Sequence, residues 1–150
     1  MKKIGEYTAR GFIRTDGSIN RIILDDGSFK TAYRIVEFVI APHDMDNTTT
    51  RVITSKLLTD DDTSTGVNWN WDNNEEIAWS IFAYDANASQ FGFTFKQIDP
   101  DNLVVQDLYV IADEAQQSVD IKVNYFVRME KYEINDSQGA LAMVRNRSQA

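Results

Sequence analysis

The chain has 150 residues, of which 43% are hydrophobic and 25% are charged, and this composition predicts one folded domain and excludes an intrinsically disordered protein. Its 15 basic and 23 acidic residues give a formal net charge of −8, which opposes binding of the domain body to nucleic acid or to an anionic membrane surface. Because cysteine is absent, disulfides, thiolate nucleophiles and cysteine-ligated metals are excluded.

The beginning of the chain shows no secretory signal. A basic start is followed by Glu6, Arg10 and Arg14, which interrupt the apolar run that such a signal needs. No stretch reaches the roughly 18 apolar residues of a membrane span. We therefore expect a protein that is made in the cytoplasm and has no contact with a membrane.

The first predicted elements are strands. Residues 19–24 and 29–35 flank Asp25-Asp26-Gly27-Ser28, and an Asp-Gly turn between two apolar runs predicts a β-hairpin. The segment 33–41 is rich in Val, Ile and Phe and ends at Pro42, which cannot donate a ladder hydrogen bond. It is predicted to be a buried strand.

The middle of the chain continues this pattern. Residues 48–58 and 77–84 are predicted strands, and residues 59–68 form a long polar connection between them. In the strand predicted over 90–98, Phe91, Phe93 and Phe95 share one face. Three aromatic side chains on one face require a cover.

The last strands show the clearest periodicity. Asp99-Pro100-Asp101-Asn102 is a turn that predicts a hairpin between the preceding strand and residues 103–111. Residues 121–129 alternate apolar and polar side chains, and the apolar phase then shifts to Tyr132 and Ile134. The shift predicts a bulge or bend near Glu130.

These segments amount to roughly eight short strands with no amphipathic helix between them. The pattern predicts an all-β, single-domain, antiparallel β-sandwich that is jelly-roll-like, with a barrel as the alternative closure. We expect this domain to cover residues 1–136. Residues 137–150 depart from the pattern and are predicted to form a C-terminal arm or a short helix.

Catalytic motifs are missing from the sequence. His43 is the single histidine, which leaves a zinc site or a Ser-His-Asp triad poorly supported and favours an ordinary loop residue. Aspartates that recur in loops offer oxygen ligands for calcium, but they match no EF-hand spacing and are interpreted as solvated turn residues. We predict no enzyme, no catalytic residue, no metal and no cofactor; an enzyme acting through loop carboxylates is a distant alternative. The aspartates in question are Asp44, Asp46, Asp60, Asp61, Asp62, Asp99 and Asp101.

Two tryptophans form the most unusual local feature. Trp69 and Trp71 are two positions apart, which places both indoles on one face of an extended chain, and Trp79 follows in an apolar strand. Such indoles anchor a core or a subunit interface, or they stack on sugars. We favour core or interface, in part because a further indole can pack against Trp79.

The C-terminal residues differ in charge from the rest of the chain. Leu141, Met143 and Val144 are followed by Arg145 and Arg147, so a basic segment ends a strongly acidic body. Opposite charge attracts such an arm to a neighbouring copy of the protein. A frayed terminus is the alternative.

Three stretches carry a resemblance to a known group of proteins. They are Ile98–Leu108, Val123–Tyr132 and Gly139–Ala150, and together with the tryptophan segment they resemble small all-β virion proteins of marine bacteriophages. The resemblance implies a non-enzymatic virion structural protein, made in the host cytoplasm, that self-assembles or docks on a phage particle as a shell, decoration or cement, vertex or tail component.

Its implied partners are copies of itself and other virion proteins, in a homo-oligomer. The competing hypothesis is a carbohydrate-binding β-sandwich module that uses Trp69 and Trp71.

Overall fold

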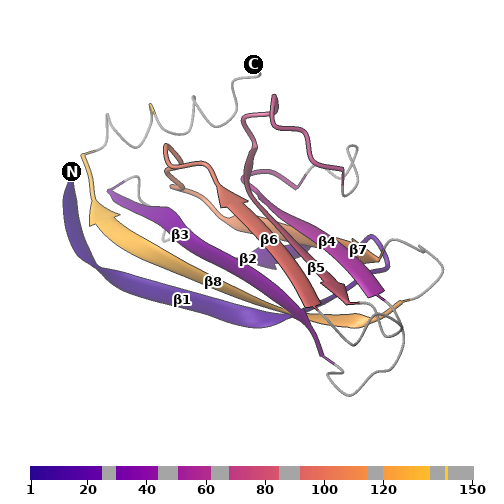
Figure 1. Cartoon of the computed structure of the whole chain (residues 1–150). Helices are drawn as coiled ribbons and strands as arrows, with labels where there is room; N and C mark the ends of the chain where they lie inside the picture. The colour runs from indigo at the N-terminus through magenta and orange to yellow at the C-terminus, as the bar shows by residue number, and fades with distance from the viewer. Residues whose placement is uncertain are drawn as a thin grey trace.

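The computed structural model describes residues 1–24, 30–43, 51–61, 68–84, 92–114 and 120–135, together with Leu141. Within these ranges the chain forms eight β-strands (Figure 1). Their bounds are β1 Lys2–Arg14, β2 Asn20–Ile22, β3 Thr31–Pro42, β4 Arg51–Leu58, β5 Glu76–Tyr84, β6 Gly92–Ile98, β7 Leu108–Glu114 and β8 Lys122–Glu133.

The strands form two antiparallel sheets that pack face to face (Figure 1). One sheet has three strands in the order β1-β8-β3, and the other has five in the order β2-β7-β4-β5-β6. Strand β3 contacts β5 and β6 across the interface, and β1 contacts β7. The predicted all-β antiparallel sandwich is therefore confirmed.

The strand order is that of a jelly roll with one change. A jelly roll of eight strands pairs the first strand with the eighth, the second with the seventh, the third with the sixth and the fourth with the fifth. Here β1 pairs with β8, β2 with β7 and β4 with β5. Strand β6, however, pairs with β5 and extends the five-stranded sheet, so β3 is an edge strand.

The segment after β6 pairs with the edge that β6 leaves open. The main chains of Tyr33 in β3 and Val104 exchange two hydrogen bonds of 2.8 Å. The buried side chain of Asn102 accepts a hydrogen bond from the Ile35 backbone N–H at 2.8 Å and donates one to the Ile35 carbonyl at 3.2 Å. This amide takes the place of a peptide group beside β3.

The core lies between the sheets and follows from the alternation in β8. Val123, Tyr125, Val127 and Met129 are buried, whereas Asn124 and the other alternate side chains face outward. The buried side chains of β8 pack on Leu57, Val110 and other apolar residues of the five-stranded sheet. A smaller cluster of Ala32, Val105 and Ile134 closes one end.

The irregularity predicted near Glu130 is present, but its extra residues belong to the neighbouring strands. Strand β1 shifts register between Lys3 and Gly5, and β3 shifts between Ile35 and Glu37, on either side of this part of β8. Strand β8 itself runs on to Glu133.

Both predicted hairpins are wrong. Strands β2 and β3 lie in different sheets, and β6 and β7 are not neighbours. Residues 103–107 are not a strand, and Val104 forms an isolated bridge there. Strand β3 pairs with β8 instead, and β7 pairs with β2 and β4.

Candidate functional site

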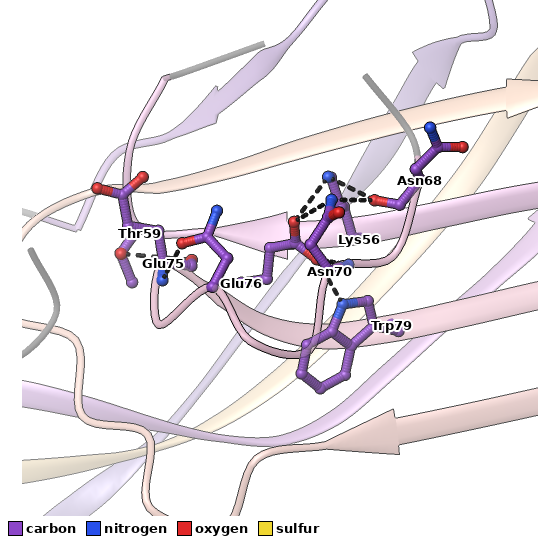
Figure 2. Close-up of polar contacts among 8 residues, drawn as sticks. Lys56, Thr59, Asn68, Asn70, Glu75, Glu76 and Trp79 are labelled. Atoms are coloured by element: carbon purple, nitrogen blue, oxygen red, sulfur yellow. Dashed lines mark hydrogen bonds and ion pairs between the residues drawn. The ribbon is translucent and has the colours of Figure 1, made fainter. Parts of the chain in front are cut away.

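A buried ion pair lies on the outer face of the five-stranded sheet (Figure 2). Lys56 Nζ lies 3.0 Å from Glu76 Oε2, and both side chains have no exposed surface. Lys56 comes from β4 and Glu76 is the first residue of β5, so the antiparallel register brings them together. Lys56 Nζ also donates a 2.8 Å hydrogen bond to the Asn68 carbonyl.

Glu76 collects further donors from the segment that precedes β5. Its Oε1 accepts hydrogen bonds from the Asn70 backbone N–H at 2.7 Å and from Trp79 Nε1 at 3.0 Å, and its Oε2 accepts one from Asn70 Nδ2 at 3.0 Å (Figure 2). Burial alone raises the pKa of this carboxyl, but the hydrogen bonds from Trp79, Asn70 and Lys56 outweigh burial and lower the pKa below its ordinary value of 4.5. Glu76 is therefore charged at neutral pH and fixes the preceding turn in place.

The turn itself is closed by its own backbone. Asn73 N donates to the Asn70 carbonyl at 2.9 Å, and Glu76 N donates to the Asn73 carbonyl at 3.1 Å. The described residues 68–75 are thus held over the sheet from both ends. Trp69 and Trp71 lie in this segment.

We call the resulting surface the aromatic face and define it as Trp69, Trp71, Trp79, Phe93 and Phe95. Trp69 stacks on Phe95 with ring centroids 6.0 Å apart and planes at 27°, and Trp71 packs on Trp79 at 5.8 Å and 59°. Trp71 remains 62% exposed and Phe93 58% exposed. The ring contacts hold the aromatic face in place, and Trp71 and Phe93 still present large apolar surface to solvent.

The prediction for the two tryptophans is partly wrong. They do not lie in an extended chain, because the turn sends each indole to a different partner. The expected packing of a further indole on Trp79 is confirmed, and Trp71 supplies it. The cover expected for the phenylalanines is partial: Trp69 covers Phe95, Phe93 is exposed, and Phe91 lies outside the described residues.

The predicted C-terminal interface residues are mostly outside the described part of the chain. Leu141 is described and is exposed. Met143, Val144, Arg145 and Arg147 are outside it, so their contacts with a neighbour stay a prediction.

The structure places the histidine and the loop aspartates that the sequence singles out as follows. No three His, Cys, Asp or Glu side chains in the described ranges gather where they could hold a metal ion. His43 is exposed, and its backbone N–H donates to the Lys122 carbonyl at 3.0 Å. Asp99 Oδ1 accepts the backbone N–H of Asp101 at 3.0 Å, which is a turn contact. Across the same ranges, no helix has the length and apolar character to span a membrane.

Sequence reasoning missed the ion pair and the contribution of β6 to this site. Lys56 follows Ser55 and precedes Leu57 in a predicted strand, where a lysine normally faces solvent. The alternation of Phe93 and Phe95 was a usable signal, since it showed an aromatic surface that needed a partner.

No protein-family model matches the chain. A search of the curated proteins found no match either.

Proposed function

We propose that this chain is a non-enzymatic structural protein of a virus particle, which assembles with copies of itself and with other virion proteins through the aromatic face. The observation that carries the proposal is the exposure of Trp71 and Phe93 on a turn that a fully buried ion pair holds in place. The assignment to a virus particle comes from the resemblance of the sequence to virion proteins of marine bacteriophages.

The physical argument starts from the energy of association. Tryptophan is enriched among residues that dominate interface energetics, because a large apolar side chain is removed from water on binding. A surface that is ordered before binding loses little conformational entropy when it binds. The Lys56 and Glu76 network provides that order for the segment carrying Trp71. The aromatic face therefore has the properties of an interface centre.

The strand order supports the same setting. Jelly rolls are used by viral capsid proteins, and also by lectins, because two packed sheets leave their outer faces and loops free for contacts. This chain keeps three of the four symmetric pairings of that fold, through β1 with β8, β2 with β7 and β4 with β5.

The test is the oligomeric mass of Trp71→Ala, measured by light scattering over a range of concentrations. We expect a loss of about 2 kcal/mol or more of association free energy, which corresponds to roughly 30-fold weaker assembly. Ile23→Ala is the matched control, because Ile23 is 69% exposed and does not belong to the aromatic face. Circular dichroism verifies that both variants fold.

An unchanged mass for folded Trp71→Ala would contradict assembly through the aromatic face. A wild-type protein that stays monomeric at every concentration, alone and with purified particles, would contradict the structural role itself.

A carbohydrate-binding module is the second candidate. The exposed indole of Trp71 favours it, since an open indole with the exposed polar residues Asn68 and Asp72 nearby in sequence is a typical sugar platform. Glycan-array binding by the wild type that disappears in Trp71→Ala would select this function.

A further inference from the structure

A second surface lies on the outer face of the three-stranded sheet. A groove of about 510 Å³ crosses the face where β1, β8 and β3 run side by side. We call it the cationic groove and define it by the residues Arg10, Phe12, Val39, Lys122, Asn124 and Phe126.

The register explains why these six side chains meet. Asn124 of β8 lies opposite Phe12 of β1, and Phe126 lies opposite both Arg10 of β1 and Val39 of β3. Alternation places these residues on the solvent side, because Val123, Tyr125 and Val127 point into the core. More than a hundred positions of sequence separate the β1 residues from the β8 residues, so the sheet is what brings them together.

The floor of the groove is apolar. Phe12 is 50% exposed, and Phe126 is also exposed. Lys122 Nζ lies 3.9 Å from the centroid of the Phe12 ring, a cation–π contact that holds the ammonium group at the groove. An occupant thus meets aromatic surface and positive charge together.

Charge is distributed unevenly along this face. Toward the other end of the sheet, carboxylates and cations pair with one another: Lys3 lies 2.8 Å from Glu130, and Arg128 lies 3.9 Å from both Glu6 and Glu37. In the groove, by contrast, Arg10 and Lys122 form no ion pair with any residue that the structure describes. Among the described residues, the groove thus combines two cations outside any ion pair with two exposed phenylalanines.

Four aspartates lie at the end of the molecule opposite the cationic groove. Asp60 and Asp61 follow β4, and Asp99 and Asp101 follow β6. The bridge between Tyr33 and Val104 places the turn after β6 near the beginning of β3, whereas Val39 belongs to the other end of that strand. We call Asp60, Asp61, Asp99 and Asp101 the acidic end.

We propose that the cationic groove of one copy receives the acidic end of a second copy, so that the subunits associate head to tail. This inference rests on the proposed function and adds the contact by which copies recognise one another. The two surfaces are complementary in charge and lie at opposite ends of the molecule, which allows the contact to repeat from copy to copy. Such a heterologous contact closes into a ring or continues as a filament.

A polyanion is a poorer occupant than an acidic protein surface. A nucleic acid strand that extends beyond the groove meets Glu6, Glu37 and Glu130, and the whole chain carries a charge of −8. An acidic loop presents its charge locally and avoids these carboxylates. The observations therefore favour a second copy.

The test is a charge swap in the full chain. The groove variant is Arg10→Glu/Lys122→Glu, and the end variant is Asp60→Lys/Asp61→Lys. We expect each variant alone to self-associate at least about tenfold more weakly than the wild type at low salt. An equal mixture of the two variants restores association, because the reversed charges are again complementary.

Sedimentation velocity of each variant and of the mixture provides the measurement, after circular dichroism has verified folding. Lys2→Glu/Lys96→Glu is the matched control, since it changes net charge by the same amount at exposed positions outside the groove. Rescue in the mixture, with a control that assembles like the wild type, supports the contact.

Three results would overturn the proposal: a groove variant that assembles like the wild type, a mixture that shows no rescue, or equal weakening by the control. A groove variant that assembles normally but loses binding to a labelled single-stranded oligonucleotide would assign the groove to nucleic acid instead. If the wild type assembles and only the swap fails, the proposed function stands without this contact. A wild-type protein that stays strictly monomeric would contradict both the proposed function and the groove contact.

Discussion

The pair of Lys56 and Glu76 places two charges where neither side chain has exposed surface. Removing a charge from water costs several kcal/mol, and attraction between the partners offsets this only when hydrogen bonds satisfy the remaining donors and acceptors. Here three donors besides Lys56 Nζ reach the Glu76 carboxylate, two from Asn70 and one from Trp79. We interpret the pair as the device that sets the position of the tryptophan turn.

Substitution of Lys56 by methionine leaves the carboxylate of Glu76 buried without its cation. We expect Lys56→Met to lower the free energy of unfolding by about 3–5 kcal/mol at pH 7, measured by urea denaturation. Lys96→Met is the control, since Lys96 is exposed, and we expect a change within about 0.5 kcal/mol.

The same pair predicts how this difference depends on pH. The folded-state pKa of Glu76 lies below its ordinary value of 4.5, so its stabilising contribution is complete above that value and is lost as the pH falls through the folded pKa. In Lys56→Met the cation that helps to lower the pKa is gone. The stability gap between the wild type and the variant should therefore narrow as the pH falls toward the folded-state pKa of Glu76 in the wild type, and a gap independent of pH would contradict this account.

At this scale the sequence predicted apolar positions better than polar ones. The buried positions of β8 and the packing on Trp79 follow from alternation and from residue type. A lysine and a glutamate that are 20 positions apart carry no mark of a buried pair, because each is normally solvated. Their burial depends on a turn that covers them, which no local pattern reports.

At the scale of the elements, the side chain of Asn102 stands in for a strand. Its amide pairs with the buried backbone of Ile35, and Val104 continues the contact with Tyr33. Together they cover the part of β3 that a sixth strand covers in a regular jelly roll.

Replacement of Asn102 by alanine tests the role of its amide in pairing with the Ile35 backbone. We expect Asn102→Ala to lower the free energy of unfolding by about 1–3 kcal/mol, because the Ile35 N–H loses its partner inside the protein. Faster hydrogen exchange at the Ile35 amide, measured by NMR, locates the effect. Gln97→Ala serves as the control, since the exposed Gln97 side chain makes one 3.3 Å contact to the neighbouring carbonyl. Equal effects of both substitutions would contradict the role of Asn102.

Local signals located strands but not their partners. The turns after β2 and β6 are real in the sequence, yet neither joins a hairpin, because partner choice in a sandwich depends on how distant strands close the core. Strand β1 was not predicted from the sequence, because its inward positions include Ala9 and Gly11, which are too small to show an apolar alternation. The fold class was predictable from periodicity, and the pairing was not.

At the scale of the whole molecule, charge and exposed apolar surface point toward association. The body is acidic, and the C-terminal residues 139–150 are predicted to be a basic arm that reaches a neighbour. Removing residues 139–150 should leave a folded domain with a lower oligomeric mass by light scattering, because the core lies in β1–β8.

Arg145→Gln/Arg147→Gln separates charge from length in this arm. If the basic side chains act by attraction, the substitution reproduces the loss in low salt, and the effect shrinks as salt screens the charges. An unchanged oligomeric mass after removal of residues 139–150 would indicate that the segment is a frayed terminus.

Surfaces at this scale were harder to predict than the core. Phe12 and Phe126 are unremarkable in the sequence, and the groove exists only because the first and last strands lie side by side. A surface assembled from distant strands has no local signature, whereas the tryptophan segment could be singled out because its residues are adjacent.

The pairing of β1 with β8 also has a consequence for biosynthesis. The partner of Lys2 is Glu133, so β1 is synthesised well before β8, the strand with which its ladder forms. Strands β4, β5 and β6 are consecutive neighbours and can zip together while translation continues. We therefore expect β4, β5 and β6 to pair before β1 pairs with β8.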